Sequence, residues 1–237
     1  MGQNTDILAN VEKIRFSDQT IEAADITGKD LLAKIYIGYY GRAPDPDGLD
    51  FWLDQLTTAE QQGEARGKVL DDIANSFAGS EEAQARFPFL GKADPSDAEI
   101  ESFVASVYEN LFNRTPDHAG KTFWRKEIED HLSEGGTPGA IILDMVSGSQ
   151  NTAESLDATT VQNKARAALR YADTYAEDDN LAWDKAEDLS VAQTIVDGVG
   201  KAQSSLDNAV SQIESLGGGA SVAALQPAGT GDVDGMG

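Results

Sequence analysis

One pattern, Arg-x-Pro-Asp-x-x-Gly-x-x-Phe-Trp, occurs twice in this chain, at residues 42–52 and again at residues 114–124. The two copies lie 72 residues apart, and an apolar run with helical spacing precedes each of them. A proline prevents the preceding helix from continuing, and the aspartate beside it is a preferred N-cap for the next helix. Repetition at a fixed period is typical of tandem structural units. We therefore predict two helical units, each built around a helix-turn-helix corner.

Apolar periodicity extends the helical prediction over most of the chain. The first unit covers residues 29–92 and the second covers residues 93–155, where Ser96 and Glu99 form a capping box at the first helix. A C-terminal helical segment is predicted over residues 156–216. Residues 217–237 are rich in glycine and have too little apolar content to fold alone, which predicts a flexible tail.

The first 28 residues have a different pattern. Apolar and polar residues alternate over residues 6–24 around a Ser-Asp-Gln break, which predicts a short β-hairpin. Residues 27–30 resemble a capping box, so the first helix is expected to begin there. The predicted fold class is mainly α: tandem helical units, a C-terminal helical segment and a short N-terminal β-hairpin.

The residues of the repeated pattern are predicted to have structural roles. Each arginine is spaced to pair with the aspartate three residues later and so to close the turn. Both tryptophans are expected to point into the core, where replacement by alanine would cost on the order of 3 kcal/mol. The structural set is Arg42, Pro44, Asp45, Gly48, Trp52, Arg114, Pro116, Asp117, Gly120 and Trp124.

A functional interpretation treats Asp45, Asp47 and Asp50 as calcium ligands. Carboxylate oxygens suit calcium, but an EF-hand loop needs glycine at its sixth position and a bidentate glutamate at its twelfth. Gly48 is only fourth from Asp45, and the second copy lacks the later acids. Calcium is therefore an alternative confined to the first copy, beside a purely structural turn. Acids of the N-terminal strand pair are a further calcium alternative.

A second functional interpretation is an aromatic platform for sugar rings, since aromatic faces flanked by acids suit polyhydroxylated ligands. The candidate ligand-binding residues are Tyr39, Tyr40, Asp47 and Asp50. The aromatic set of this platform is Tyr36, Tyr39, Tyr40, Phe51 and Trp52, and Tyr39 is expected to be the member that reaches the solvent. The second copy has Leu111 and Phe112 at the tyrosine positions, which argues against two equivalent sugar sites of this kind.

Charge and composition exclude several classes of partner. Acidic residues outnumber basic ones 41 to 18, so the formal net charge is −23, and such a surface repels nucleic acid and anionic lipid. No apolar stretch is long enough to span a bilayer, which predicts no direct membrane insertion. Cysteine is absent, which excludes disulfides and thiolate zinc sites. Neither histidine is accompanied by a known catalytic motif, so we predict that the protein is not an enzyme.

The segment LLAKIYIGYYGRAPDPDGLDFWLDQL, followed by the Ile-Ala-x-Ser-Phe-x-x-Ser-Glu-Glu run at residues 73–82, resembles the domain-of-unknown-function family numbered 4214 (DUF4214). The segment FVASVYENLFNRTPDHAGKTFWRKEI resembles it more loosely, because the second aspartate of the turn is missing. The resemblance covers about residues 29–155. The segment DILANVEKIRFSDQT resembles the strand pair that ends calcium-binding repeats or cadherin-like modules of type I secreted proteins.

This resemblance implies a large secreted or surface-attached bacterial protein, such as an adhesin, an S-layer-type protein or a repeat-in-toxin protein, with no catalytic residues to carry over. The expected function is that of a non-catalytic extracellular module for bacterial surface attachment, which binds cell-envelope polysaccharide or a protein partner. One alternative is a structural spacer or self-assembly module of an adhesin or S-layer protein. The other is a glycan hydrolase, which needs paired carboxylates facing one cleft.

Overall fold

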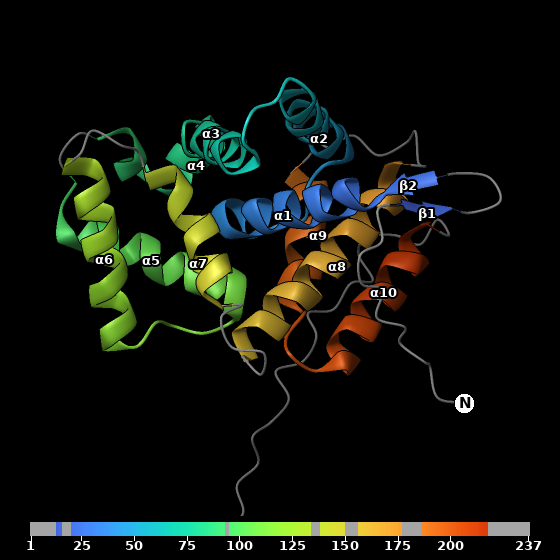
Figure 1. The fold of residues 1–237 in the computed structure, drawn as a ribbon. Coiled ribbons are helices and arrows are strands. Elements are labelled where there is room, and N and C mark those ends of the chain that lie inside the picture. The colour runs from blue at the N-terminus through green and yellow to red at the C-terminus, as the bar shows by residue number, and fades with distance from the viewer. Residues whose placement is uncertain are drawn as a thin grey trace, which may run out of the picture.

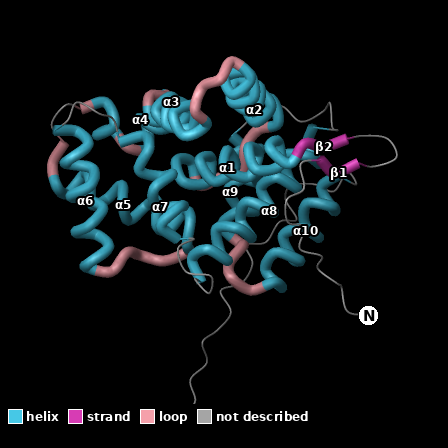
Figure 2. Tube along the Cα trace, viewed as in Figure 1, coloured by secondary structure: helices cyan, strands magenta, loops and turns pink. Residues whose placement is uncertain are grey.

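The computed structural model describes residues 13–15, 20–92, 95–133, 138–149, 156–176 and 186–217 (Figures 1 and 2). These residues are mainly helical, which confirms the predicted class. The α-helices are α1 (Ala23–Tyr40), α2 (Pro46–Gln61), α3 (Arg66–Ala78), α4 (Glu81–Arg86), α5 (Asp97–Phe112), α6 (His118–Ser133), α7 (Ile141–Ser149), α8 (Leu156–Ala176), α9 (Ala186–Asp197) and α10 (Gln203–Gly217). Two short 3₁₀ turns are η1 (Pro88–Gly91) and η2 (Pro138–Ala140).

The N-terminal region differs from the prediction. Strand β1 (Lys13–Arg15) pairs antiparallel with β2 (Thr20–Glu22), but most of the hairpin predicted over residues 6–24 lies outside the described residues. Helix α1 already begins at Ala23, so the expected start at Thr27 is wrong. Asp30 does not cap this helix, because its carboxylate instead accepts hydrogen bonds from Lys34 and Gln162. The predicted tail after Gly217 also lies outside the described residues.

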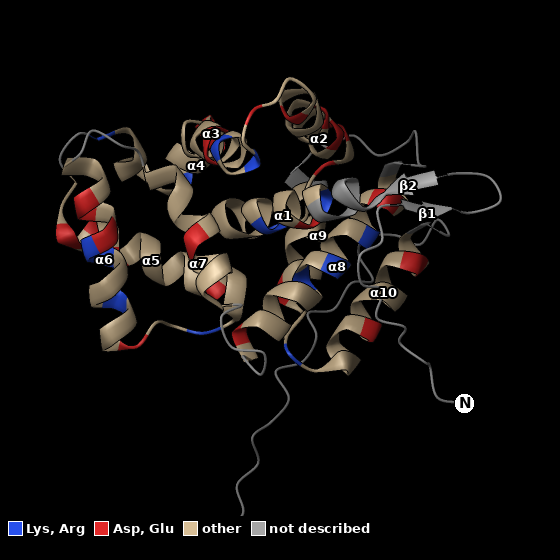
Figure 3. Cartoon of the chain, viewed as in Figure 1, with Lys and Arg blue, Asp and Glu red and all other residues tan. Residues whose placement is uncertain are grey.

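Helix α1 runs through the middle of the molecule, with α2, α5 and α8 packed against it (Figure 1). Its C-terminal third, from Ile35 to Tyr40, has no charged residue, whereas charged residues lie on the outer helices such as α3, α6 and α10 (Figure 3). Helix α8 contacts α1, α5 and α10. The buried residues of both predicted units therefore form one continuous core with the C-terminal segment.

The two corner helices end in the same way. Gly41, after α1, and Asn113, after α5, both have left-handed backbone conformations, with φ of 63° and 53°. These residues are 72 positions apart, and glycine and asparagine tolerate this conformation best. A cation meets a carbonyl oxygen in the last turn of each helix, where the carbonyls lack partners within the helix. Arg86 donates to the Tyr40 carbonyl oxygen, and Lys164 donates to that of Asn110, each at 2.6 Å.

No helix in the described part of the chain combines the length and apolar character that crossing a bilayer requires.

Candidate functional site

The repeated turn has the same N-cap in both copies. The Gly48 N–H donates to Asp45 Oδ1 at 2.7 Å, and the Gly120 N–H donates to Asp117 Oδ1 at the same distance. Helix α2 begins at Pro46, directly after its cap, which confirms the predicted N-cap role of Asp45. A Cβ at Gly48 would lie 2.3 Å from the Tyr36 hydroxyl, so only glycine fits this close approach.

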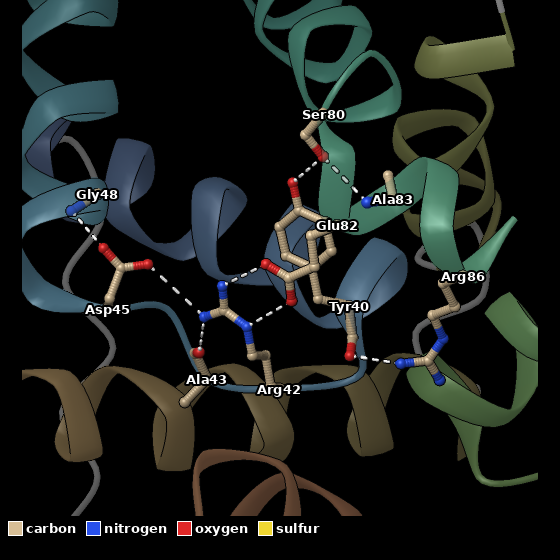
Figure 4. A network of polar contacts seen from close by, with 9 residues as sticks. All are labelled: Tyr40, Arg42, Ala43, Asp45, Gly48, Ser80, Glu82, Ala83 and Arg86. Atoms are coloured by element: carbon tan, nitrogen blue, oxygen red, sulfur yellow. Dashed lines mark hydrogen bonds and ion pairs between the residues drawn. The ribbon is translucent and has the colours of Figure 1, made fainter. Parts of the chain in front are cut away.

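The arginine of each turn pairs mainly with a carboxylate that the sequence analysis did not predict. Arg42 donates from Nε and Nη2 to both carboxylate oxygens of Glu82, each at 2.9 Å (Figure 4). The predicted partner, Asp45, lies 3.6 Å from Arg42 Nη1, which is too far for a good hydrogen bond. The predicted ion pair with Asp45 is therefore present, but the hydrogen bonds of the guanidinium go to Glu82, because one Asp45 oxygen caps α2 and Glu82 offers a bidentate partner.

The second copy repeats this arrangement. Arg114 donates from Nε and Nη2 to the two oxygens of Asp157, at 2.9 and 2.6 Å, and not to Asp117 as predicted. Glu82 and Asp157 each lie on the first turn of a helix, α4 and α8 respectively. Each acid follows a serine by two positions in the sequence, which is the signal that could have identified it.

Aromatic rings cover the buried arginine. Arg42 is 7% exposed, and its guanidinium carbon lies 5.3 Å from the Tyr36 ring centre and 5.1 Å from that of Tyr40. Burial by itself lowers the pKa of Arg42, but the hydrogen bonds and charge of Glu82, with Asp45, outweigh it and raise the pKa above its usual value. Arg42 is therefore a permanent cation in a structural clamp. The prolines of the turn, Pro44 and Pro116, are also buried.

The tyrosines of the predicted sugar platform are not accessible. Tyr39 is fully buried, and its hydroxyl donates to the Gly139 carbonyl oxygen at 2.9 Å, so the expectation that it lies nearest the solvent is wrong. Tyr40 is 8% exposed, and its hydroxyl shares a hydrogen bond with the Ser80 hydroxyl. An outer helix would expose one face, but α1 is covered on several sides, so adjacent side chains are both buried.

The predicted calcium ligands do not converge. Asp45 faces the Gly48 N–H, whereas Asp50 is exposed and lies 3.6 Å from the Lys29 ammonium. Asp47 is exposed on the first turn of α2. Across the described ranges, no three acidic or histidine side chains gather as a metal site would require. The N-terminal acids that we considered as further calcium ligands lie outside those ranges.

Each copy of the pattern places one phenylalanine at the surface. Phe51 is 55% exposed and Phe123 is 53% exposed. Each ring lies 4.9 Å from the neighbouring tryptophan, Trp52 or Trp124, in an edge-to-face arrangement. The tryptophans were expected in the core, and both are partly buried against it. The aromatic surface therefore consists of a duplicated Phe-Trp pair, and Phe123 is the member that the sequence analysis missed.

An open polar pocket of about 470 Å³, which we call the cavity, lies between α1 and α8 and faces the solvent. Its polar lining residues are Asp30, Lys34, Thr159, Gln162, Asn163 and Arg166. The residues from α1 and those from α8 are about 130 positions apart, so no local pattern indicated the cavity.

The fold and the two turns define a mainly helical protein built on a repeated, arginine-clamped corner. Its residues 74–154 match the family described as Domain of unknown function (DUF4214). This confirms the predicted family over that segment, which contains the second copy of the pattern but not the first. Neither the curated proteins nor the solved structures give a significant match.

The matched segment divides both clamps. It includes Glu82 without Arg42, and it ends three residues before Asp157 although it includes Arg114.

Proposed function

We propose that this protein is a non-catalytic attachment module that acts outside a bacterial cell and binds cell-envelope polysaccharide. The observation that carries the proposal is the exposure of Phe51 and Phe123 at equivalent places of the two copies. Packing does not require either ring at the surface, since the tryptophan beside it already makes the core contact. An exposed aromatic face can stack on the apolar face of a sugar ring, while nearby polar groups bind its hydroxyls.

A duplicated contact suits a polymer of repeating units. When one chain engages two sites, the second contact becomes intramolecular and overall binding strengthens without a new interaction type. Asp47 lies one turn before Phe51 and is exposed, so it can accept hydrogen bonds from sugar hydroxyls. Asp50 serves less well, because its carboxylate lies near Lys29.

The charge of the chain supports the same choice of partner. A formal charge of −23 disfavours nucleic acid and bare anionic membrane, whereas neutral sugar hydroxyls are not repelled. The hydrolase alternative needs two carboxyl groups across one cleft. The described cavity between α1 and α8 has a single carboxylate, Asp30, which Lys34 and Gln162 already hold.

The test compares binding of purified cell-envelope polysaccharide to three forms of the protein by biolayer interferometry. The Phe51→Ala/Phe123→Ala double variant is expected to bind at least about tenfold more weakly than the wild type. Leu156→Ala is the matched control, because Leu156 is also an exposed apolar side chain, at 59%, but has no counterpart in the pattern. Unchanged binding by the double variant, or no binding by the wild type, would contradict the proposal.

The self-assembly alternative makes a different prediction from the same residues. Exposed apolar side chains also serve in protein contacts. If the wild type forms oligomers in light scattering, and the double variant is monomeric while neither binds polysaccharide, the protein is an assembly or spacer module.

A further inference from the structure

The cavity between α1 and α8 is organised around a buried cation. Lys34 is 1% exposed, and its ammonium donates to Asp30 at 2.6 Å and to the Gln162 side-chain oxygen at 3.1 Å. The Gln162 amide nitrogen in turn donates to the other Asp30 oxygen at 2.9 Å. This closed ring fixes all three side chains before any ligand arrives. An ammonium carries three hydrogens, so one donor of Lys34 remains beyond these two bonds.

Arg166 lies one turn beyond Gln162 on α8 and lines the same cavity. Its side chain is exposed. Arg166 has no hydrogen-bond partner among the residues that the structure describes. Six other arginines each have one, namely Arg42, Arg66, Arg86, Arg114, Arg125 and Arg170. In a chain with 41 acids, a guanidinium without a carboxylate partner at a polar cavity indicates a place for an external anionic group.

We propose that this cavity binds a carboxylated sugar unit, with the ligand carboxylate on Arg166 and its hydroxyls on the polar ring of Asp30, Lys34 and Gln162. The lining residues offer two cations and one carboxylate, together with amide donors and acceptors. A ligand with one negative group and several hydroxyls matches this mixture, because hydroxyls both donate and accept. This inference depends on the proposed function only in taking cell-envelope polysaccharide as the source of the sugar unit.

Other anions fit the lining less well. Inorganic phosphate carries more negative charge at neutral pH than a single carboxylate does, so Asp30 and the strongly acidic molecule repel it more. A nucleotide would find no aromatic ring for its base among the described residues that line the cavity. A simple carboxylate such as acetate would leave the polar ring unused.

The test uses the whole chain, with free glucuronate as the probe. Binding is measured by ligand-observed NMR titration. Three comparison ligands are used. Glucose has the sugar ring without the charge, acetate has the carboxylate without the sugar, and inorganic phosphate tests whether the site binds any anion. We expect glucuronate to bind at least about tenfold more tightly than each of the three.

Substitutions at two positions of α8 distinguish binding at this site from a general effect of positive charge. Arg166→Gln is expected to weaken glucuronate binding at least about tenfold, and Arg166→Lys to have an intermediate effect because it keeps the charge but loses the planar fork. Arg170→Gln is the control, since Arg170 is one turn further along α8 and pairs with Glu214 away from the cavity. It should leave binding unchanged. Thermal melts of each variant check that the fold is intact.

The inference is overturned if glucuronate does not bind, if Arg166→Gln binds it as the wild type does, or if glucose, acetate or phosphate binds equally well. These outcomes differ from failure of the proposed function. Glucuronate binding without polysaccharide binding would remove the attachment proposal and leave this site. Polysaccharide binding that depends on Phe51 and Phe123, without glucuronate binding, would remove only the site.

Discussion

Lys164 shows how a single residue connects helix packing to pH. Its side chain is fully buried, and its ammonium donates to the Asn110 carbonyl near the C-terminus of α5. Burial lowers the pKa of Lys164 from its ordinary value of 10.5 to about 8, although the charges of Asp197 and Glu109 oppose this shift. The folded state therefore holds this proton less tightly than the unfolded chain does.

The first prediction concerns stability at alkaline pH. Between pH 8 and pH 10.5 the unfolded chain binds more protons at this lysine, so the contribution of Lys164 to the free energy of unfolding rises with pH. The gain is about 3 kcal/mol over the full range. Urea unfolding of the wild type and of Lys164→Met, measured from pH 7 to pH 10.5, should show a difference that grows in favour of the wild type. Parallel curves would contradict the pKa shift.

The buried tyrosines do not disturb this comparison. Burial raises the pKa values of Tyr36, Tyr39 and Tyr40 above the ordinary 10.0, so the unfolded chain loses these protons first and stability falls from about pH 10 upward in both proteins. Both proteins contain all three, and their effects cancel in the difference.

The second prediction is that Tyr39→Phe destabilises the protein more than Tyr40→Phe does. Tyr39→Phe leaves the buried Gly139 carbonyl without the hydroxyl that it binds, at a cost of about 1–2 kcal/mol. The Tyr40 hydroxyl pairs instead with the Ser80 hydroxyl, which also accepts from the Ala83 N–H and is less deeply enclosed. Chemical denaturation of the two variants tests the order, and equal costs would show that the Tyr39 hydroxyl is not buried as described.

Among the elements, the two clamped corners share one geometry but differ in burial. The Arg42 side chain is 8% exposed and that of Arg114 is 45% exposed. A charge that loses its partner is costly when water cannot replace the partner, and inexpensive when water can.

The third prediction follows from this contrast. Glu82→Ala should destabilise the protein by about 2 kcal/mol, below the cost of breaking a fully enclosed pair because Asp45 remains near Arg42. The equivalent change in the second copy, Asp157→Ala, should cost less than about 1 kcal/mol. Equilibrium unfolding at neutral pH measures both. The reverse order would show that the second clamp is the more important one.

Local sequence signals predicted much at this level. Asp45 caps α2 as expected, and Ser96 with Glu99 forms the predicted capping box at α5. These contacts join residues three positions apart, so they depend only on nearby sequence. The partners of Arg42 and Arg114 lie 40 and 43 residues downstream, and the burial of Tyr39 depends on which helices cover α1. Such features depend on tertiary packing, which periodicity does not specify.

In the whole molecule, α1 and α8 join the two copies into one core. Leu32, Ile35 and Tyr39 on α1 are fully buried, as is Tyr171 on α8. The duplication could be predicted from the sequence, but the shared core could not, because each copy has enough apolar residues to suggest a core of its own. For the same reason, the cavity between α1 and α8 became visible only when residues distant in sequence were placed side by side.

The fourth prediction is that residues 74–154 alone do not form a cooperative fold. This fragment lacks α1 and α8, so the apolar faces of α5 and α7 that pack on them would be exposed to water. A longer fragment, residues 20–217, contains all ten α-helices of the described chain and should unfold in one cooperative transition. Circular dichroism melts compare the two, and a sharp melt of the short fragment would contradict the shared core.

The division of both clamps by the family match has an evolutionary consequence. Recombination that transferred only residues 74–154 into another gene would separate both pairs. Arg114 would arrive without Asp157, and Glu82 would arrive without Arg42. The recipient would have to supply both missing charges at matching positions. A transferable cassette must therefore extend from the arginine of one corner through the acid some forty residues downstream, and shuffled descendants should have their junctions outside that interval.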